Sequence, residues 1–193
     1  DCFALSEATD GAGAGALSVF GVILGTGCGG GIVIDGKLLA GPNSIAGEWG
    51  HNSLPWPSQS ETPGPECYCG KHGCIETFLS GPGWSARHFE DCGQPMTAAE
   101  IAASANAGDA GARASLELYL DRLARATALV INILDPDIFV LGGGLSNIDA
   151  LYTQLPPRWR KYVFSDRVDT RLTRNKHGDS SGVRGAAWLW PES

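Results

Sequence analysis

Residues 47–51 read Gly-Glu-Trp-Gly-His, and residues 67–76 read Cys-Tyr-Cys-Gly-Lys-His-Gly-Cys-Ile-Glu. The two stretches bring one imidazole and three thiols into a short span of chain. Thiolates and imidazoles are the usual ligands of a tetrahedral zinc ion, and three cysteines with one histidine make a closed structural site. The spacing therefore predicts a zinc site with the ligands His51, Cys67, Cys69 and Cys74.

Three other interpretations of these residues are open. His72 lies inside the cysteine cluster and competes with His51 for the fourth ligand position. Three clustered cysteines can also form one disulfide and leave a spare thiol. Taken alone, His51 would more often be a buried, hydrogen-bonded histidine than a ligand. The combination of all four residues favours the metal.

The composition indicates an ordered domain. The chain has 193 residues, of which 43% are hydrophobic and 18% charged, so it suits one domain or slightly more with a sizeable core. The net charge of -7 argues against a nucleic-acid-binding surface, because phosphate backbones are bound by basic patches. No apolar run approaches the roughly 20 residues needed to span a bilayer, so we expect no membrane partner.

The remaining cysteines and the first residues indicate the cellular context. Cys2, Cys28 and Cys92 are scattered, which is typical of a reduced, cytoplasmic protein rather than a disulfide framework. No signal peptide is visible at the start. Because the only methionine is Met96, we expect the chain to begin inside a longer gene product.

Apolar patterning predicts alternating strands and helices. Strands are expected at 19–24, 32–34, 37–39 and 138–141, and helices at 3–12, 75–88 with a break at 81–83, 97–106, 110–134 and from Ser146. Residues 152–176 are assigned an amphipathic helix and one strand, and 177–190 a loop and then a helix with small residues.

Two glycine clusters, 25–31 and 142–144, each follow an expected strand. Such loops let the backbone approach a phosphate and aim N–H groups at it, and Thr26 would add a hydroxyl. The first cluster lacks the Lys-Ser/Thr of the Walker pattern, and tight turns or close packing would explain either cluster equally simply. Two such loops in one chain favour a nucleotide.

The chain resembles the ROK family of repressors and sugar kinases, and within it the bacterial fructokinase or mannokinase branch. The resemblance covers essentially the whole sequence. It rests on residues 25–29, 47–52, 54–56, 67–77, 132–137, 141–144 and 176–190. The cysteine cluster together with Gly-Glu-X-Gly-His is its most specific part.

This resemblance implies an α/β, actin-like and hexokinase-like ATPase fold of the ribonuclease H-like type. Residues 1–193 would be the C-terminal domain of a two-domain kinase, with a zinc-binding substrate loop at 47–76. The implied reaction is phosphorylation of a hexose by ATP and Mg²⁺, with fructose favoured and mannose or glucose next. The implied partners are the N-terminal domain and a second copy in a homodimer.

The resemblance also implies roles for individual residues. Sugar hydroxyls would be held by Glu48, His51 and Glu76, and ATP by Thr26 and Gly27 at its phosphates and by Gly143 and Gly144 at its adenosine. His51 would ligate a structural zinc at the same time, which fixes its ring.

The catalytic base is not assigned within the chain. By the register of the resemblance, the family's general-base Asp falls just upstream of Asp1, and Asp1 is only a weaker substitute. We therefore expect this chain alone to be inactive. The alternatives are a sugar-sensing repressor with its helix-turn-helix upstream, and a zinc-stabilised binding domain without catalysis.

Overall fold

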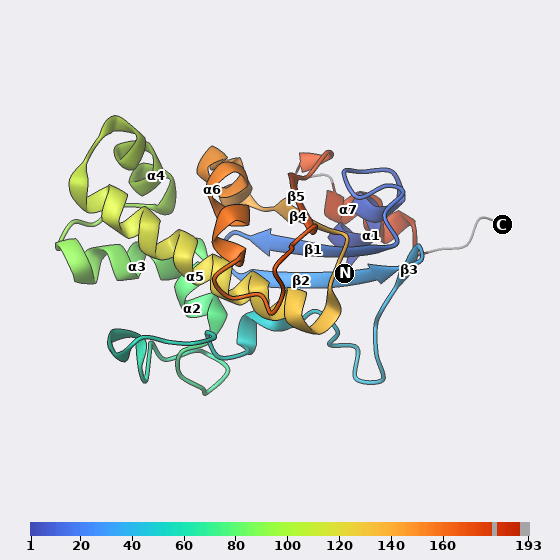
Figure 1. Cartoon of the computed structure of the whole chain (residues 1–193), viewed down its shortest axis with the longest axis horizontal. Coiled ribbons are helices and arrows are strands. Elements are labelled where there is room, and N and C mark those ends of the chain that lie inside the picture. Colours follow the sequence, from blue (N-terminus) through green and yellow to red (C-terminus); the bar gives the residue numbers. More distant parts are fainter. Residues whose placement is uncertain (179–180, 190–193) are drawn as a thin grey trace.

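The computed structural model describes residues 1–178 and 181–189, which form one five-stranded sheet with helices on its two faces (Figure 1). The strands are β1 Ser18–Leu24, β2 Cys28–Ile34, β3 Lys37–Leu38, β4 Ile138–Gly142 and β5 Arg171–Arg174. The α-helices are α1 Cys2–Thr9, α2 Ile75–Leu79, α3 Gly81–Cys92, α4 Ala98–Ala107, α5 Ala110–Leu134, α6 Asp149–Trp159 and α7 Ser181–Ala187. Short 3-10 turns are η1 Trp49–His51, η2 Gln59–Glu61 and η3 Gly144–Asn147.

Strand β1 is the centre of the sheet, whose order is β3-β2-β1-β4-β5. It pairs antiparallel with β2 and parallel with β4. Alternate side chains of a strand point to opposite faces. Phe20 and Val22 accordingly join the large core with α2, α5 and α6, whereas Val19 joins a smaller core with α1. The sheet is thus covered on both faces.

The first glycine cluster is shorter as a loop than the sequence predicts. Only residues 25–27 form the turn, and Gly29 to Gly31 belong to β2. Glycines occur at these strand positions because neighbouring segments approach the β2 backbone closely, and not because the chain turns there. A Cβ at Gly30 would lie 2.8 Å from the Gly47 carbonyl oxygen, and one at Gly31 would lie 2.9 Å from the Ala4 side chain. These glycines let neighbouring segments pack on the strand.

Several helix boundaries also differ from the predicted ones. The predicted break within 75–88 is present, but it falls at Ser80, and the Gly-Pro-Gly at 81–83 forms the first turn of α3, because Ser80 caps that helix and Pro82 suits its first turn. Beyond β4 the chain makes the η3 turn first, and α6 begins at Asp149 rather than Ser146. The second glycine cluster therefore leads into a turn and not directly into a helix.

The long helix is confirmed with the predicted bounds. Asp109 caps α5 by accepting the N–H of Ala112, and Asp135 ends it in a left-handed conformation. The helix and strand predicted within 152–176 are present as parts of α6 and as β5. In the tail, Gly185 of α7 packs directly on the backbone of Cys2. Asp179, Ser180 and Trp190 of the predicted tail lie outside the described residues.

Candidate functional site

The four predicted metal ligands come together. The ligand atoms of His51, Cys67, Cys69 and Cys74 all lie within 4.8 Å of one another. His51 Nδ1 is 3.6 Å from Cys67 Sγ, and Cys69 Sγ is 3.6 Å from Cys74 Sγ. Zinc–sulfur bonds of about 2.3 Å in a tetrahedron separate two sulfurs by about 3.8 Å. The cluster therefore has the dimensions of a zinc site.

Backbone hydrogen bonds hold the cysteine segment in shape. The Cys67 N–H donates to the Lys71 carbonyl at 2.8 Å, and the Gly70 N–H donates to the Cys67 carbonyl at 2.9 Å. Gly70 and Gly73 have φ of 84° and 69°, a left-handed conformation that favours glycine. This turn is what brings Cys74 back to the two earlier thiols.

The competing interpretations of the cluster do not fit the geometry. His72 is exposed, pairs by its backbone with Glu66, and is not one of the clustered ligands. All six cysteines lie in the described part of the chain and are free thiols. His51 is only half-buried, and its Nδ1 faces a thiol rather than a hydrogen-bonding acceptor of the core.

The electrostatics of the thiols also suit a cation. Burial raises the pKa of Cys74 to about 12, whereas the backbone N–H of Lys71 lowers the pKa of Cys69. Several thiolates packed together without a cation would repel one another. A bound metal supplies that cation and keeps the ligands deprotonated. The donor set thus fits a structural zinc ion.

Glu76 connects the cysteine cluster to the β1–β2 turn. It stands in the first turn of α2, two residues after Cys74. Its Oε2 accepts the Cys28 N–H at 2.9 Å, and a Cβ on Gly27 would lie 2.9 Å from the same oxygen. The predicted sugar-binding carboxylate and the predicted phosphate turn are therefore direct neighbours.

Glu48 is exposed and lines a cavity of about 300 Å³ beside the start of the chain. Asp1 and residues 29–31 of β2 line the same cavity. The segment that carries Glu48 is anchored on β2, because Trp49 Nε1 donates to the Gly29 carbonyl at 3.0 Å. Of the three predicted sugar contacts, Glu48 is thus the one that shares a cavity with the first residue of the chain.

A larger cavity of about 740 Å³ lies at the other side of the β1–β2 turn. Thr26 and Gly144, two of the residues predicted to contact a nucleotide, line it. Gly143 is not among its lining residues, and its role is steric: its φ is 80°, and a Cβ there would lie 2.4 Å from the Leu24 carbonyl oxygen. Gly27 sits in the turn next to Thr26 but faces Glu76 instead.

The sequence did not predict two parts of the site. The wall of the 740 Å³ cavity includes residues of α3 and α4, among them Pro82, Ser85 and Asn106. Tyr68 is exposed between two metal ligands, and its hydroxyl lies 2.8 Å from His51 Nε2. Its position between two cysteines was the available signal. Desolvation of its hydroxyl, together with the nearby Glu76 carboxylate, raises the pKa of Tyr68.

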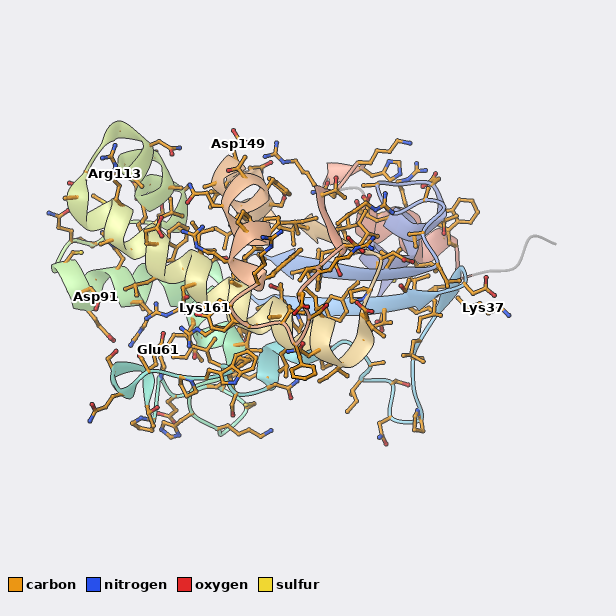
Figure 2. All side chains as sticks on the ribbon, viewed as in Figure 1. Lys37, Glu61, Asp91, Arg113, Asp149 and Lys161 are labelled. Atoms are coloured by element: carbon orange, nitrogen blue, oxygen red, sulfur yellow. The ribbon has the colours of Figure 1, made fainter. Side chains whose placement is uncertain are left out.

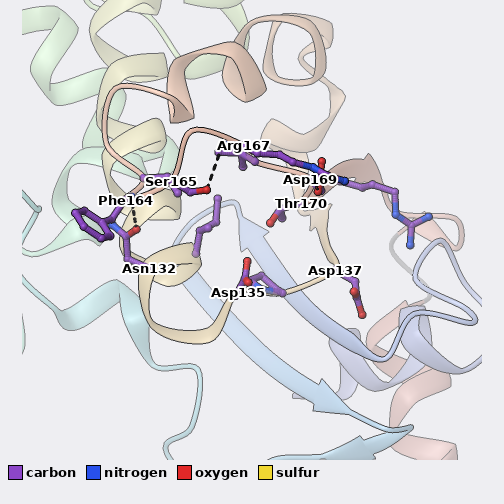
Figure 3. A pocket seen from close by; sticks show the side chains of 13 residues that line it. Asn132, Asp135, Asp137, Phe164, Ser165, Arg167, Asp169 and Thr170 are labelled. Carbon is purple, nitrogen blue, oxygen red and sulfur yellow. Dashed lines mark hydrogen bonds and ion pairs between the residues drawn. The ribbon is translucent and has the colours of Figure 1, made fainter.

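A third cavity, of about 670 Å³, lies between the C-terminal end of α5 and the segment before β5 (Figure 3). Asp135, Asp137, Arg167 and Asp169 line it, and Asn132 Oδ1 accepts the Phe164 N–H at 2.8 Å beside it. None of the predicted site residues lines this cavity. It is therefore separate from the metal cluster and the glycine turns.

Comparison with known proteins agrees with this arrangement. The ROK family model matches residues 1–193. The chain belongs to the ROK family. It is 45% identical over 195 residues to N-acetyl-D-glucosamine kinases of Escherichia coli, and this match covers 98% of the chain and 64% of the relatives. The chain thus spans about two thirds of the length of these curated relatives.

Solved ROK structures have the same fold. The ROK hexokinase of Thermus thermophilus superposes with a TM-score of 0.85 at 29% identity, covering 96% of this chain and 61% of that one. The ROK glucokinase of Streptomyces griseus, solved with glucose and AMPPNP, superposes with a TM-score of 0.84 at 26% identity, covering 97% of this chain and 65% of that one. A ROK transcriptional regulator homologous to the E. coli MLC protein superposes with a TM-score of 0.82 at 26% identity, covering 97% of this chain and 49% of that one. The predicted hexokinase-like, actin-like ATPase fold is confirmed.

Within residues 1–178 and 181–189, every helix is too short or too polar to cross a membrane.

Proposed function

We propose that this chain is the C-terminal domain of an ATP-dependent hexose kinase. The observation that carries the proposal is the contact between Glu76 and the β1–β2 turn. Glu76 follows the metal cluster and accepts the Cys28 N–H, while Thr26 in the same turn lines the 740 Å³ cavity. A carboxylate suited to sugar hydroxyls thus adjoins a glycine turn suited to phosphates.

On the sugar side, Glu48, His51 and Glu76 bind and orient the hexose. Carboxylates accept hydrogen bonds from hydroxyls, and a histidine with one nitrogen on a metal donates from the other. The metal would be held by His51 and the three cysteines. A zinc ion there supplies a rigid crosslink of the loop, with no open position for activating water.

On the nucleotide side, the cavity beside Thr26 has room for an adenosine, with Gly144 at its edge and Gly143 letting the chain pass close to β1. Gly27 and Thr26 direct backbone and hydroxyl donors at the phosphates, and Mg²⁺ accompanies ATP. Phosphoryl transfer depends mainly on such positioning and on charge stabilisation.

In the reaction, the sugar hydroxyl oxygen forms a bond to the γ-phosphorus as the bond to ADP breaks. The hydroxyl proton passes to a general base. We assign that base to an Asp that precedes Asp1 in the full-length protein, within the N-terminal part that completes the two-domain kinase. Asp1 shares a cavity with Glu48 and is the weaker alternative. We also propose that the protein acts as a homodimer.

The substrate of the curated relatives differs from the substrate that the sequence motifs favour. The fructokinase-like motifs favour fructose, whereas the 45% identical relatives are N-acetyl-D-glucosamine kinases. We give more weight to N-acetyl-D-glucosamine, because the relatives' similarity extends over 98% of this chain. Fructose, mannose and glucose are the other candidates.

A sugar-sensing repressor is the second candidate function, because a ROK transcriptional regulator matches the fold with a TM-score of 0.82. An ADP-release assay of the full-length, zinc-loaded protein tests both. With Mg-ATP, turnover of N-acetyl-D-glucosamine or another hexose supports the kinase. Absence of turnover with all four hexoses, together with sugar-dependent binding of promoter DNA, supports the repressor.

A further inference from the structure

Glu61 belongs to the Pro-rich loop of residues 55–65, and its carboxylate lies buried against α5 (Figure 2). Its Oε1 accepts Arg122 Nε at 2.8 Å and Arg125 Nη2 at 2.8 Å. Its Oε2 accepts Arg125 Nη1 at 2.9 Å and the Ser58 N–H at 2.8 Å. Both oxygens are therefore fully used by donors, and both arginines come from one helix. We call these three charged residues, Glu61, Arg122 and Arg125, the Glu61 brace.

Charges buried in this way need a reason. Removing ions from water is costly, and apolar side chains of similar volume would often stabilise a fold equally well. Here the side chains of Arg122 and Arg125 are only 8% and 5% exposed. Hydrogen-bonded ion pairs, unlike apolar contacts, have fixed directions and lengths. The brace is thus suited to fixing the position of the loop on α5.

The brace holds the loop at two separate places. Glu61 fixes the η2 turn, and Arg125 Nη1 also donates to the carbonyls of Pro55 at 3.2 Å and Trp56 at 3.0 Å. Asp121 pairs with Arg125 Nε at 3.0 Å and keeps that guanidinium in place. The loop between His51 and Cys67 is therefore attached to α5 by two segments, residues 55–56 and the η2 turn.

These two segments enclose the chain that carries Cys74. The Leu54 N–H donates to the Gly73 carbonyl, and the Gly73 N–H donates to the Pro65 carbonyl, both at 2.9 Å. Gly64 approaches Gly73 so closely that a Cβ would lie 2.6 Å from its Cα. A shift of either segment would therefore move Cys74 relative to the other ligands.

The brace also reaches the helix of Glu76. The Arg122 guanidinium lies over the Phe78 ring, 5.1 Å from its centroid. Phe78 is buried in α2, two residues after Glu76. One arginine of α5 therefore contacts both the metal loop and the helix that presents the sugar-binding carboxylate.

We propose that Glu61 is a positioning residue for the metal ligands and for Glu76, acting through Arg122 and Arg125. The part concerning Glu76 rests on the proposed kinase function, whereas the part concerning the metal does not. Groups that hydrogen-bond directly to metal ligands typically change metal affinity by about 10- to 100-fold when they are removed. Glu61 acts one step further out, through the two arginines and the loop backbone, so we expect an effect near the lower end of this range.

The test measures zinc affinity by competition with a chelating dye, and hexose and ATP KM values, on the full-length protein. Glu61→Gln removes the charge at nearly constant shape. We expect zinc binding weakened by about 10-fold or more, a raised hexose KM and an unchanged ATP KM. Arg122→Lys keeps the charge but loses the Nε contact, and we expect a smaller loss in the same direction.

Two controls separate positioning from general effects. Glu117→Gln makes the same change on α5, in a pair with Arg158 of α6, and we expect wild-type zinc affinity. Leu116→Ala removes core volume from the same helix, so it lowers stability while leaving the three charged residues of the Glu61 brace unchanged. Glu61→Asp, which restores a carboxylate, should recover part of the zinc affinity.

Wild-type zinc affinity in both Glu61→Gln and Arg122→Lys would overturn the proposal, as would an equal loss in Leu116→Ala. Should Glu61→Gln fail to fold, Arg122→Lys decides alone. Zinc loss in a protein that phosphorylates no hexose would support the brace and refute the kinase. Full kinase activity with unaltered zinc affinity in the variants would support the kinase and refute the role of the brace.

Discussion

The Tyr68 hydroxyl lies 2.8 Å from His51 Nε2, with the two rings edge to face at 5.0 Å between centroids. Because His51 Nδ1 faces the thiols, a metal there leaves the ring proton on Nε2, which then donates to the Tyr68 oxygen. The proposed sugar contact of His51 uses the same nitrogen. If the proposed sugar contact is made, Tyr68 and the hexose would therefore compete for one donor.

Replacing Tyr68 by phenylalanine should accordingly strengthen sugar binding. An exposed hydrogen bond contributes about 0.5–1 kcal/mol, so we expect the hexose dissociation constant of Tyr68→Phe to fall by about two- to five-fold. Calorimetric titration of the zinc-loaded, full-length protein measures it. Tyr152→Phe in α6, which loses a hydroxyl that donates to the Ser146 carbonyl of η3, is the control and should bind sugar like the wild type. Weaker binding in Tyr68→Phe would mean that Tyr68 holds the sugar.

The metal ligands can be tested by exchanging one thiol. Cys69→Ser replaces a soft thiolate by a hydroxyl, and we expect the purified protein to lose most of its zinc and to unfold at a lower temperature. Elemental analysis and calorimetry measure the two effects. Cys92→Ser changes a cysteine of α3 outside the cluster and should keep both properties. Full zinc content in Cys69→Ser would exclude this residue as a ligand.

The two neighbouring glycines after β4 should respond differently to alanine. At Gly143 the positive φ and the Leu24 carbonyl leave no room for a Cβ, whereas nothing lies within 4 Å of one at Gly144. We expect Gly143→Ala to lower the free energy of unfolding by about 1–3 kcal/mol and Gly144→Ala to change it by less than about 0.5 kcal/mol. Urea denaturation measures both. Equal effects would contradict the close approach of β4 to β1.

The Glu61 brace predicts a pH dependence of stability. Burial alone would raise the pKa of Glu61, but hydrogen bonds from Arg125 and Arg122 lower it from 4.5 to about 2. A carboxylate with a depressed pKa stabilises the fold above its unfolded pKa, and this contribution is lost as the pH falls through the folded value. Between about pH 5 and pH 2 we expect the loss of this contribution to lower the free energy of unfolding by about 3 kcal/mol.

Denaturation at stepped pH values compares the wild type with Glu61→Gln. The variant lacks the titrating group, so its free energy of unfolding should fall less steeply over this window. The difference between the two proteins removes the contribution of other carboxylates with a lowered pKa, such as Glu7. Parallel pH profiles would show that Glu61 is not held ionised by the arginines.

The metal cluster was predictable because Cys67, Cys69 and Cys74 are close in sequence and one tight turn unites them. Asp35-Gly36 stands between the strands expected at 32–34 and 37–39, and both residues have positive φ in the β2–β3 turn, as such a pair favours. The length of α5 followed from its apolar spacing and from the Asp-Pro at its end. These features depend on neighbouring residues alone.

The parts that were missed depend on distant contacts. Gly30 and Gly31 read as a loop by composition, but Gly47 and Ala4 approach them there, which only the fold reveals. Glu61 gave no signal in a Pro-rich loop, because its arginine partners lie about 60 residues further on. The α3 and α4 walls of the 740 Å³ cavity meet the β1–β2 turn only through the tertiary structure.

The substitution Glu76→Gln tests the central claim, that the metal-held loop presents a sugar-binding carboxylate to the phosphate turn. Steady-state kinetics of the full-length protein would be measured with N-acetyl-D-glucosamine and Mg-ATP, with zinc content determined in parallel. Glu66→Gln, an exposed glutamate of the same loop, is the control. We expect a hexose KM raised by about 10-fold or more in Glu76→Gln alone, with normal zinc content. A hexose KM equal to that of the wild type, in a folded and zinc-loaded Glu76→Gln protein, would contradict it.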